Sequence, residues 1–195
     1  PTRSLPLGSS EVTVLEMASA YTTFASGGFR RPSFGFTAIV NSSGTRVFDR
    51  GRDAPASKRV LEDTIVAEMN GMLSQVPVIG TAVAAKLEGI PTAGKTGTAS
   101  DYRDAWFVGF SCRDTGMLTA AVWMGYPGVD GQPVRPLENV HGVARVSGGT
   151  FPAQIWSQFM TQATRTTAEC RLPTTDRFPG QRIDLTDLRD LKATV

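Results

Sequence analysis

Cysteine, histidine and net charge are all scarce in this 195-residue sequence. It contains two cysteines, Cys112 and Cys170, and a single histidine, His141. These residues lack the spacing of a metal site, so we expect neither a metal nor a cofactor. The cysteines can pair as a disulfide or remain thiols, and the sequence leaves both open. A net charge of +2 gives no reason to expect nucleic-acid binding by bulk attraction.

Long hydrophobic runs are also missing. The longest apolar runs fall far short of a bilayer span, and no signal peptide is visible. Hydrophobic residues make up 41% and charged residues 19%, which is typical of a globular domain with a core. The chain opens on Pro1 and not on Met, which fits a processed chain, a trimmed chain or one piece of a longer protein.

Hydrophobic periodicity predicts three principal helices. A capping box formed by Thr13 and Glu16 opens a helix over about 13–26. The second helix spans about 62–75 and the last about 152–165, with a short additional helix at 81–87. The second helix carries an apolar stripe of Ile65, Val66, Met69, Met72 and Leu73.

The remaining apolar segments predict strands. A strand over 34–40 and its return at 45–48 form a hairpin, followed by a polar loop at 50–58. The runs 105–110 and 118–124 are apolar on both faces, which favours an antiparallel sheet covered by helices on both sides. Residues 126–148 are rich in Gly and Pro and are expected to form a long loop.

The most informative stretch is AGKTGTAS at residues 93–100. Side chains alternate along a strand, so Lys95 and Gly97 share one face and Thr96 and Thr98 the other. Gly97 lets a ligand approach the backbone closely. Lys95 offers an electrostatic anchor or proton partner, both threonines can donate to a carboxylate, and the Thr98 N–H can face an oxyanion. This strand is expected at one edge of the sheet.

Residues 89–96 also satisfy the phosphate-binding pattern G-x-x-x-x-G-K-[ST]. That site requires a buried strand before the loop and a helix after it. An Ala-rich, helix-like segment precedes residue 89, and Gly97 disfavours a following helix. Both flanks therefore argue against nucleotide binding.

The printed sequence contains no evident nucleophile. It has no G-x-S-x-G elbow, no serine-x-x-lysine and no serine- or tyrosine-x-asparagine. We interpret His141 as a surface residue, because no serine and carboxylate pair accompanies it. Asp101 and Asp104 flank Arg103 and are interpreted as a solvated charge cluster.

Three ordered blocks resemble class A, bifunctional penicillin-binding proteins. The K-T-G strand at 93–100 and the following 104–110 resemble the third motif of penicillin-recognising transpeptidases. Residues 7–18 with 21–28 resemble the segment upstream of that motif, and residues 147–156 resemble the start of the last helix. The resemblance covers roughly residues 7–163. The family's serine-x-x-lysine and serine-x-asparagine motifs lie upstream of the matching segment.

The resemblance implies an α/β (α+β) fold, with a five-stranded antiparallel sheet covered by helices on both faces, as in penicillin-binding transpeptidases and serine beta-lactamases. It is incomplete in this chain. Residues 1–168 would be the C-terminal portion of a transpeptidase domain, and residues 169–195 a polar, extended tail.

The implied activity is peptidoglycan D,D-transpeptidation through a serine acyl-enzyme outside this chain, which beta-lactams also acylate. Lys95 and Thr98 would be catalytic, and Thr96, Gly97 and Thr98 would bind substrate. The expected partners are stem peptides, beta-lactams and the upstream part of the same domain, without nucleic acid. The location would be the extracytoplasmic (periplasmic) face of the membrane, held by an N-terminal anchor. Alternatives are a non-catalytic scaffold of the same fold and, less well matched, a serine beta-lactamase.

Overall fold

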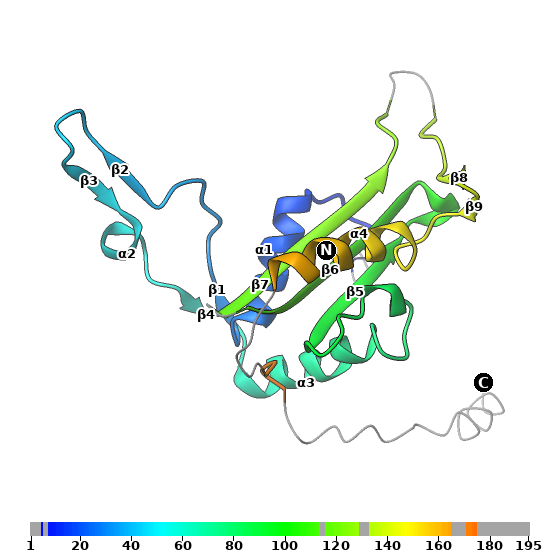
Figure 1. The fold of residues 1–195 in the computed structure, drawn as a ribbon, viewed down its shortest axis with the longest axis horizontal. Helices are drawn as coiled ribbons and strands as arrows, with labels where there is room; N and C mark the ends of the chain where they lie inside the picture. Colours follow the sequence, from blue (N-terminus) through cyan, green and yellow to red (C-terminus); the bar gives the residue numbers. More distant parts are fainter. Residues whose placement is uncertain (1–4, 6–7, 114–115, 129–132, 165–170, 175–195) are drawn as a thin grey trace.

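A three-stranded antiparallel sheet is the centre of the molecule. The structure is a computed structural model that describes residues 5, 8–113, 116–128, 133–164 and 171–174. Strands β5 (Thr92–Thr98), β6 (Asp104–Arg113) and β7 (Gly116–Gly125) pair in the order β5-β6-β7. Helix α4 (Phe151–Ala163) crosses one face, while α1 (Val14–Ala25) and α3 (Asp63–Gln75) pack on the other (Figure 1). The expected α/β fold with helices on both sheet faces is confirmed.

The face under α4 holds a core centred on Trp156. Its indole packs edge-to-face on Phe107, with ring centroids 5.2 Å apart, and both side chains are fully buried. The indole N–H donates to the Ala120 carbonyl oxygen of β7 at 3.1 Å. This hydrogen bond joins α4 to the sheet and orients the helix across it.

The opposite face is covered by α1 and α3. Ala25 of α1, Leu73 of α3, Ala93 of β5 and Phe110 of β6 form its buried cluster. The predicted stripe on α3 is partly wrong: Val66 and Leu73 are buried, whereas Ile65 and Met72 are exposed.

Helix boundaries agree with local sequence signals. Helix α1 begins after Thr13, whose hydroxyl accepts the Glu16 N–H while the Glu16 carboxylate accepts the Thr13 N–H, so the predicted capping box is confirmed. The other helices lie within one or two residues of their expected bounds. The segment at 81–87 is different: it forms only a 3₁₀ turn, η2 (Val83–Ala85).

The predicted hairpin is present but shorter than expected, formed by β2 (Ala38–Val40) and β3 (Arg46–Asp49). It extends well away from the central sheet (Figure 1). The loop expected at 50–58 contains helix α2 (Arg50–Asp53), capped by Asp49, and strand β4 (Lys58–Arg59), which pairs with β1 (Phe29–Arg30). The prediction of a polar loop there is wrong for residues 50–53, because the Asp49 carboxylate accepts the Gly51 N–H at 2.9 Å and begins the helical turn.

The long segment at 126–148 also contains more structure than expected. Strands β8 (Glu138–Val140) and β9 (Val143–Arg145) form a hairpin closed by His141 and Gly142. Both residues have positive φ, 46° and 82°, as a type I′ turn requires. A short 3₁₀ turn, η3 (Ser100–Tyr102), separates β5 from β6.

The tail expected at 169–195 lies mostly outside the described residues. Within it, Leu172 packs against the α1–α3 cluster, and the Pro173 carbonyl accepts the Asn70 side-chain amide at 2.8 Å. Cys112 is disulfide-bonded in the structure, and Cys170 lies outside the described residues.

Candidate active site on the free edge of β5

Strand β5 pairs with β6 along one side only, among the described residues. The register places Thr98 opposite Ala105, and the Ala99 N–H donates to the Asp104 carbonyl at 2.9 Å. Residues opposite one another in an antiparallel pair alternate between bonded and non-bonded positions. The N–H and C=O groups of Thr96 and Thr98 therefore point to the free edge of β5.

Lys95 reaches this free edge from the face that Ala93 shares with α1 and α3. Its ammonium donates to the Thr96 carbonyl oxygen at 2.9 Å and lies 3.4 Å from the Thr96 hydroxyl. Lys95 is exposed although the start of its strand is buried. The cation predicted from the sequence therefore lies at the free edge of β5, beside main-chain groups that β6 does not pair.

Thr96 and Thr98 lie on the other face of the strand, as alternation predicted. The Thr96 hydroxyl lies 2.7 Å from that of Thr81, and either can be the donor. The Thr98 hydroxyl accepts the Gly148 N–H at 3.1 Å. Thr98 is exposed, so its hydroxyl and its edge-facing N–H lie at the surface.

Gly97 lies opposite Trp106 on β6. A Cβ at Gly97 would lie 3.2 Å from the Trp106 Cβ, which is a tight contact. The indole tilts against Trp123 of β7, with centroids 6.3 Å apart, and the Trp123 N–H donates to the Asp104 carboxylate at 2.7 Å. Trp106 therefore supports the strand from one face.

The sequence placed residues 147–156 at the start of the last helix by resemblance, but it did not predict that this segment supports the other face of β5. Ser147, Gly148, Gly149 and Thr150 form a turn before α4, and Gly148 is the donor to Thr98. The paired glycines before the helix are a local signal of a turn. They do not indicate a contact with Thr98, because residues fifty positions apart leave no periodic pattern in the sequence.

The remaining candidate groups lie elsewhere. His141 is exposed in the β8–β9 turn, where its ring contacts Phe151. Arg103 and Asp101 form an exposed ion pair at 3.5 Å, which agrees with the predicted charge cluster. Asp104 was wrongly included in that cluster, because its carboxylate accepts the Trp123 indole N–H.

The geometry also excludes the phosphate-loop alternative. Gly94, Lys95 and Thr96 lie within β5, and the chain continues as strand to Thr98. A phosphate loop places this Lys and Thr at the start of a helix, whose N–H groups bind the phosphate. No such helix begins at this point.

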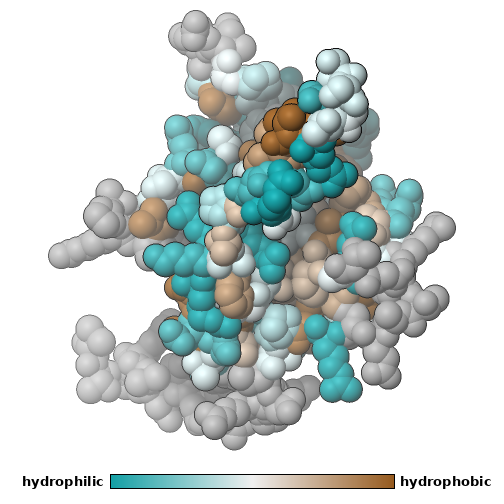
Figure 2. Space-filling model, turned by 90° about the vertical axis from the view of Figure 1, so that its left-hand side faces the viewer, coloured by the Kyte–Doolittle hydropathy of each residue, from teal (hydrophilic) through white to brown (hydrophobic). Residues whose placement is uncertain are grey.

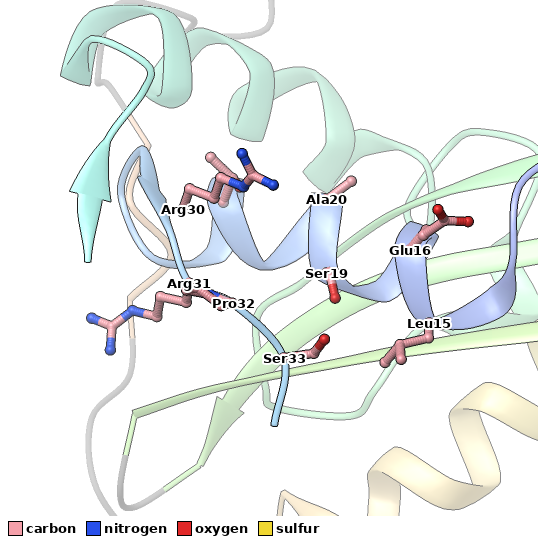
Figure 3. A pocket seen from close by; sticks show the side chains of 9 residues that line it. Leu15, Glu16, Ser19, Ala20, Arg30, Arg31, Pro32 and Ser33 are labelled. Carbon is pink, nitrogen blue, oxygen red and sulfur yellow. The ribbon is translucent and has the colours of Figure 1, made fainter. Parts of the chain in front are cut away.

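A shallow pocket of about 430 Å³ lies away from β5, between α1 and residues 30–33. Figure 3 shows Glu16 and Ser19 on the helix side, with Arg30 and Arg31 on the facing segment. The Glu16 carboxylate is already bound to the Thr13 N–H and hydroxyl. None of the β5 site residues lines this pocket.

The described residues offer neither a metal site nor a membrane-spanning helix. They contain no group of three or more His, Cys, Asp or Glu side chains placed to hold a metal ion. They also contain no helix long and apolar enough to cross a membrane.

Comparisons with known proteins match the β5 motif and its surroundings. A family model described as the penicillin binding protein transpeptidase domain matches residues 2–133. Penicillin-binding protein 1A of Mycolicibacterium smegmatis is 36% identical over 167 residues, and that of Aquifex aeolicus is 34% identical over 165. These alignments cover 82% and 85% of this chain but 20% of each relative, so the chain spans about a fifth of their length.

Solved structures agree. The penicillin-binding protein PonA1 of Mycobacterium tuberculosis has a TM-score of 0.75 and 26% identity, covering 90% of this chain and 44% of that one. Penicillin-binding protein 1A of Haemophilus influenzae shares the fold, with a TM-score of 0.66 at 22% identity over 88% of this chain and 29% of that one. The family model covers more than half of the sequence, and the strands it includes contain the lysine–threonine–glycine edge. The chain therefore belongs to the penicillin-binding protein transpeptidase family, in its class A branch.

Proposed function

We propose that this chain forms the lysine–threonine–glycine side of the active site of a peptidoglycan D,D-transpeptidase. The observation that carries the proposal is the free edge of β5, where the Lys95 ammonium lies 2.9 Å from the Thr96 carbonyl and the Thr98 N–H points outward. The ammonium, the edge-facing N–H and the two threonine hydroxyls therefore lie together along one strand edge. Such an edge can bind an extended peptide that ends in a carboxylate.

The reaction is acyl transfer. A serine supplied by polypeptide outside these 195 residues attacks the carbonyl of the penultimate D-Ala in a stem peptide. The peptide C–N bond breaks, a proton passes to the leaving nitrogen, and terminal D-Ala departs. An amine of a second stem peptide then attacks the serine ester and forms the cross-link. In a beta-lactam, the ring C–N bond breaks instead and the acyl group stays on the serine.

Lys95 supplies positive charge to this reaction. Its ammonium would donate to the serine of the family's second motif and attract the substrate carboxylate. An ammonium near an exposed edge is a strong donor to an anionic partner. Its present contacts are with the carbonyl and the hydroxyl of Thr96, which leaves at least one of its three hydrogens for these interactions.

Thr98 contributes its main chain as well as its side chain. Its N–H would be one of two oxyanion donors, and the second would come from the nucleophile's own residue. The hydroxyls of Thr96 and Thr98 would donate to the carboxylate, and Gly97 would allow the substrate backbone to approach. The oxyanion role requires the Thr98 N–H to be free of the sheet, as the register of β5 and β6 supports.

The cellular setting follows from this chemistry. Stem peptides and beta-lactams are the ligands, and the upstream part of the transpeptidase domain is the intramolecular partner. We place the site on the extracytoplasmic (periplasmic) side of the cytoplasmic membrane, anchored by an N-terminal segment of the longer protein.

Labelling with a fluorescent penicillin tests the proposal in the full-length protein. Thr98→Pro removes the edge-facing N–H, and proline is tolerated on an edge strand. We expect acylation to slow roughly 10²–10³-fold, the cost of one oxyanion donor. Lys95→Ala should slow it by a similar factor or more.

Lys86→Ala is the matched control, because Lys86 is exposed and lies outside β5. It should label at the unchanged rate. Full labelling of both Lys95→Ala and Thr98→Pro would refute the assigned roles. A protein that takes no label even when unchanged would instead fit the scaffold alternative.

A further inference from the structure

The turn from Ser147 to Thr150 is closed by a single side chain. The Thr150 hydroxyl donates to the Ser147 carbonyl at 2.7 Å and accepts the Ser147 N–H at 3.1 Å. The Thr150 N–H also donates to the same carbonyl at 3.1 Å. Both main-chain groups of Ser147 are thus satisfied, and the conformation of the intervening glycines is fixed.

These glycines lie directly against main-chain atoms. A Cβ at Gly148 would lie 2.1 Å from the Trp106 carbonyl oxygen and 2.7 Å from that of Gly97. A Cβ at Gly149 would lie 2.0 Å from the Thr81 carbonyl oxygen. Backbone atoms cannot move aside like a flexible side chain, so only glycine fits at both positions.

This close contact brings the Gly148 N–H to the Thr98 hydroxyl. Thr98 is the acceptor in the resulting 3.1 Å hydrogen bond. A hydroxyl has one hydrogen and two lone pairs, so accepting this bond fixes the rotamer while leaving the hydrogen to be donated. Thr96 differs, because its hydroxyl pairs with that of Thr81 and either can donate.

We propose that the Gly148–Gly149 turn is a positioning element for Thr98. It holds the Thr98 hydroxyl so that its hydrogen is donated to the carboxylate of the stem peptide or beta-lactam. This inference rests on the proposed function, because it assigns a carboxylate-bearing ligand to the edge of β5. It adds a specificity element: the turn makes the site discriminate a free carboxylate from its ester.

Acylation by benzylpenicillin and by its methyl ester tests the proposal in the full-length protein. Thr98→Val removes the hydroxyl and should lower the preference for the free acid about tenfold to a hundredfold, the range for a hydrogen bond to a charged group. Thr150→Val keeps the side-chain shape but opens the turn. It should also lower the preference for the free acid, because the acylation rate with benzylpenicillin falls while the rate with the methyl ester stays nearly unchanged.

Three variants serve as comparisons. Thr150→Ser retains the closing hydroxyl and should restore the preference. Thr161→Val removes a threonine hydroxyl that donates to the Ser157 carbonyl on α4, away from the site, and should change neither rate. The double variant Thr98→Val/Thr150→Val should be no worse than Thr98→Val alone, because both changes remove the same contact.

Several outcomes would overturn the inference. One is a Thr150→Val protein that reacts more slowly with acid and ester alike, which indicates a merely structural role. Another is an unchanged preference, and a third is additive loss in the double variant. If Thr150→Val does not fold, as judged by its melting temperature, Thr150→Ala removes the same hydroxyl with a smaller side chain and gives the same comparison. If the unchanged protein reacts with neither compound, the proposed function itself fails.

Discussion

Gly94 and Gly97 stand three residues apart on β5, and different neighbours occupy the space beside each. A Cβ at Gly94 would lie 2.6 Å from the Phe107 ring and 2.7 Å from the Val108 carbonyl oxygen. At Gly97 the nearest atom is the Trp106 Cβ at 3.2 Å. Gly94 is therefore required by packing, whereas the surroundings at Gly97 can adjust by a few tenths of an ångström.

The two glycines should consequently respond differently to alanine. In the full-length protein, we expect Gly94→Ala to destabilise the transpeptidase domain by about 1–3 kcal/mol, the typical cost of overpacking. Gly97→Ala should cost less stability but slow penicillin acylation. The added methyl would press on Trp106 of β6 and shift the backbone of β5 at the site. Denaturant unfolding and fluorescent-penicillin labelling measure the two effects. Equal loss of stability in both variants, with labelling unaffected in Gly97→Ala, would contradict this division.

The residues of the candidate site differ in how predictable they were. Lys95, Thr96 and Thr98 were identified because alternation along a strand is a local rule, and the structure places them as the rule requires. Gly148 was not, because its contact with Thr98 depends on how α4 packs over the sheet. Packing between distant segments has no signature in a single sequence.

Whole helices and strands also differ in whether a local signal in the sequence or packing between distant segments determines them. Helix α1 was predicted because its capping box is a local signal with a direct physical cause. The prediction of a helix at 81–87 was wrong because a high alanine content gives only a weak preference for helix, which tertiary contacts override. In this segment Thr81 bonds Thr96 and Ala82 packs beneath α4. The β8–β9 hairpin was missed because its turn uses His141 and Gly142 and not the commoner Asn-Gly.

The capping box makes the stability of α1 depend on pH. Hydrogen bonds from the Thr13 N–H, and then from its hydroxyl, lower the pKa of Glu16 below its ordinary value of 4.5. A carboxyl whose pKa is lower in the folded state stabilises that state above its unfolded pKa, and this contribution is lost as the pH falls through the folded pKa. Glu16→Gln keeps the shape of the box and removes the charge.

We therefore expect full-length protein carrying Glu16→Gln to melt at a lower temperature than the unchanged full-length protein at pH 7. The difference should shrink as the pH falls from about 5 and vanish once Glu16 is protonated in both states. Thermal unfolding followed by circular dichroism at a series of pH values measures it. A difference that is constant across the series would show that the Glu16 charge does not stabilise the helix.

At the scale of the whole molecule, many large apolar side chains lie at the surface. Leu15 of α1 is 62% exposed, and Ile79, in the segment after α3, is 80% exposed. On the projecting hairpin, Ile39, Val40 and Val47 are exposed as well. Figure 2, seen from the side of this hairpin, shows hydrophobic atoms gathered in patches among hydrophilic ones. Large contiguous apolar patches occur where a protein contacts another molecule or tends to aggregate.

We expect residues 1–195 produced alone to bind a hydrophobic dye, to self-associate and to unfold without a sharp transition. The physical reason is that β5 has a free edge within the described sheet, and both an open edge and an exposed apolar surface promote association. The full-length protein should bind little dye and unfold cooperatively, because the upstream part of the domain would cover these surfaces. Replacing Ile39 and Val47 with threonine tests whether the hairpin contributes, and should reduce self-association of the isolated chain. A monomeric, dye-free chain with a sharp unfolding transition would show that these residues fold independently, and that the upstream segment contributes to the reaction but not to the stability of this part.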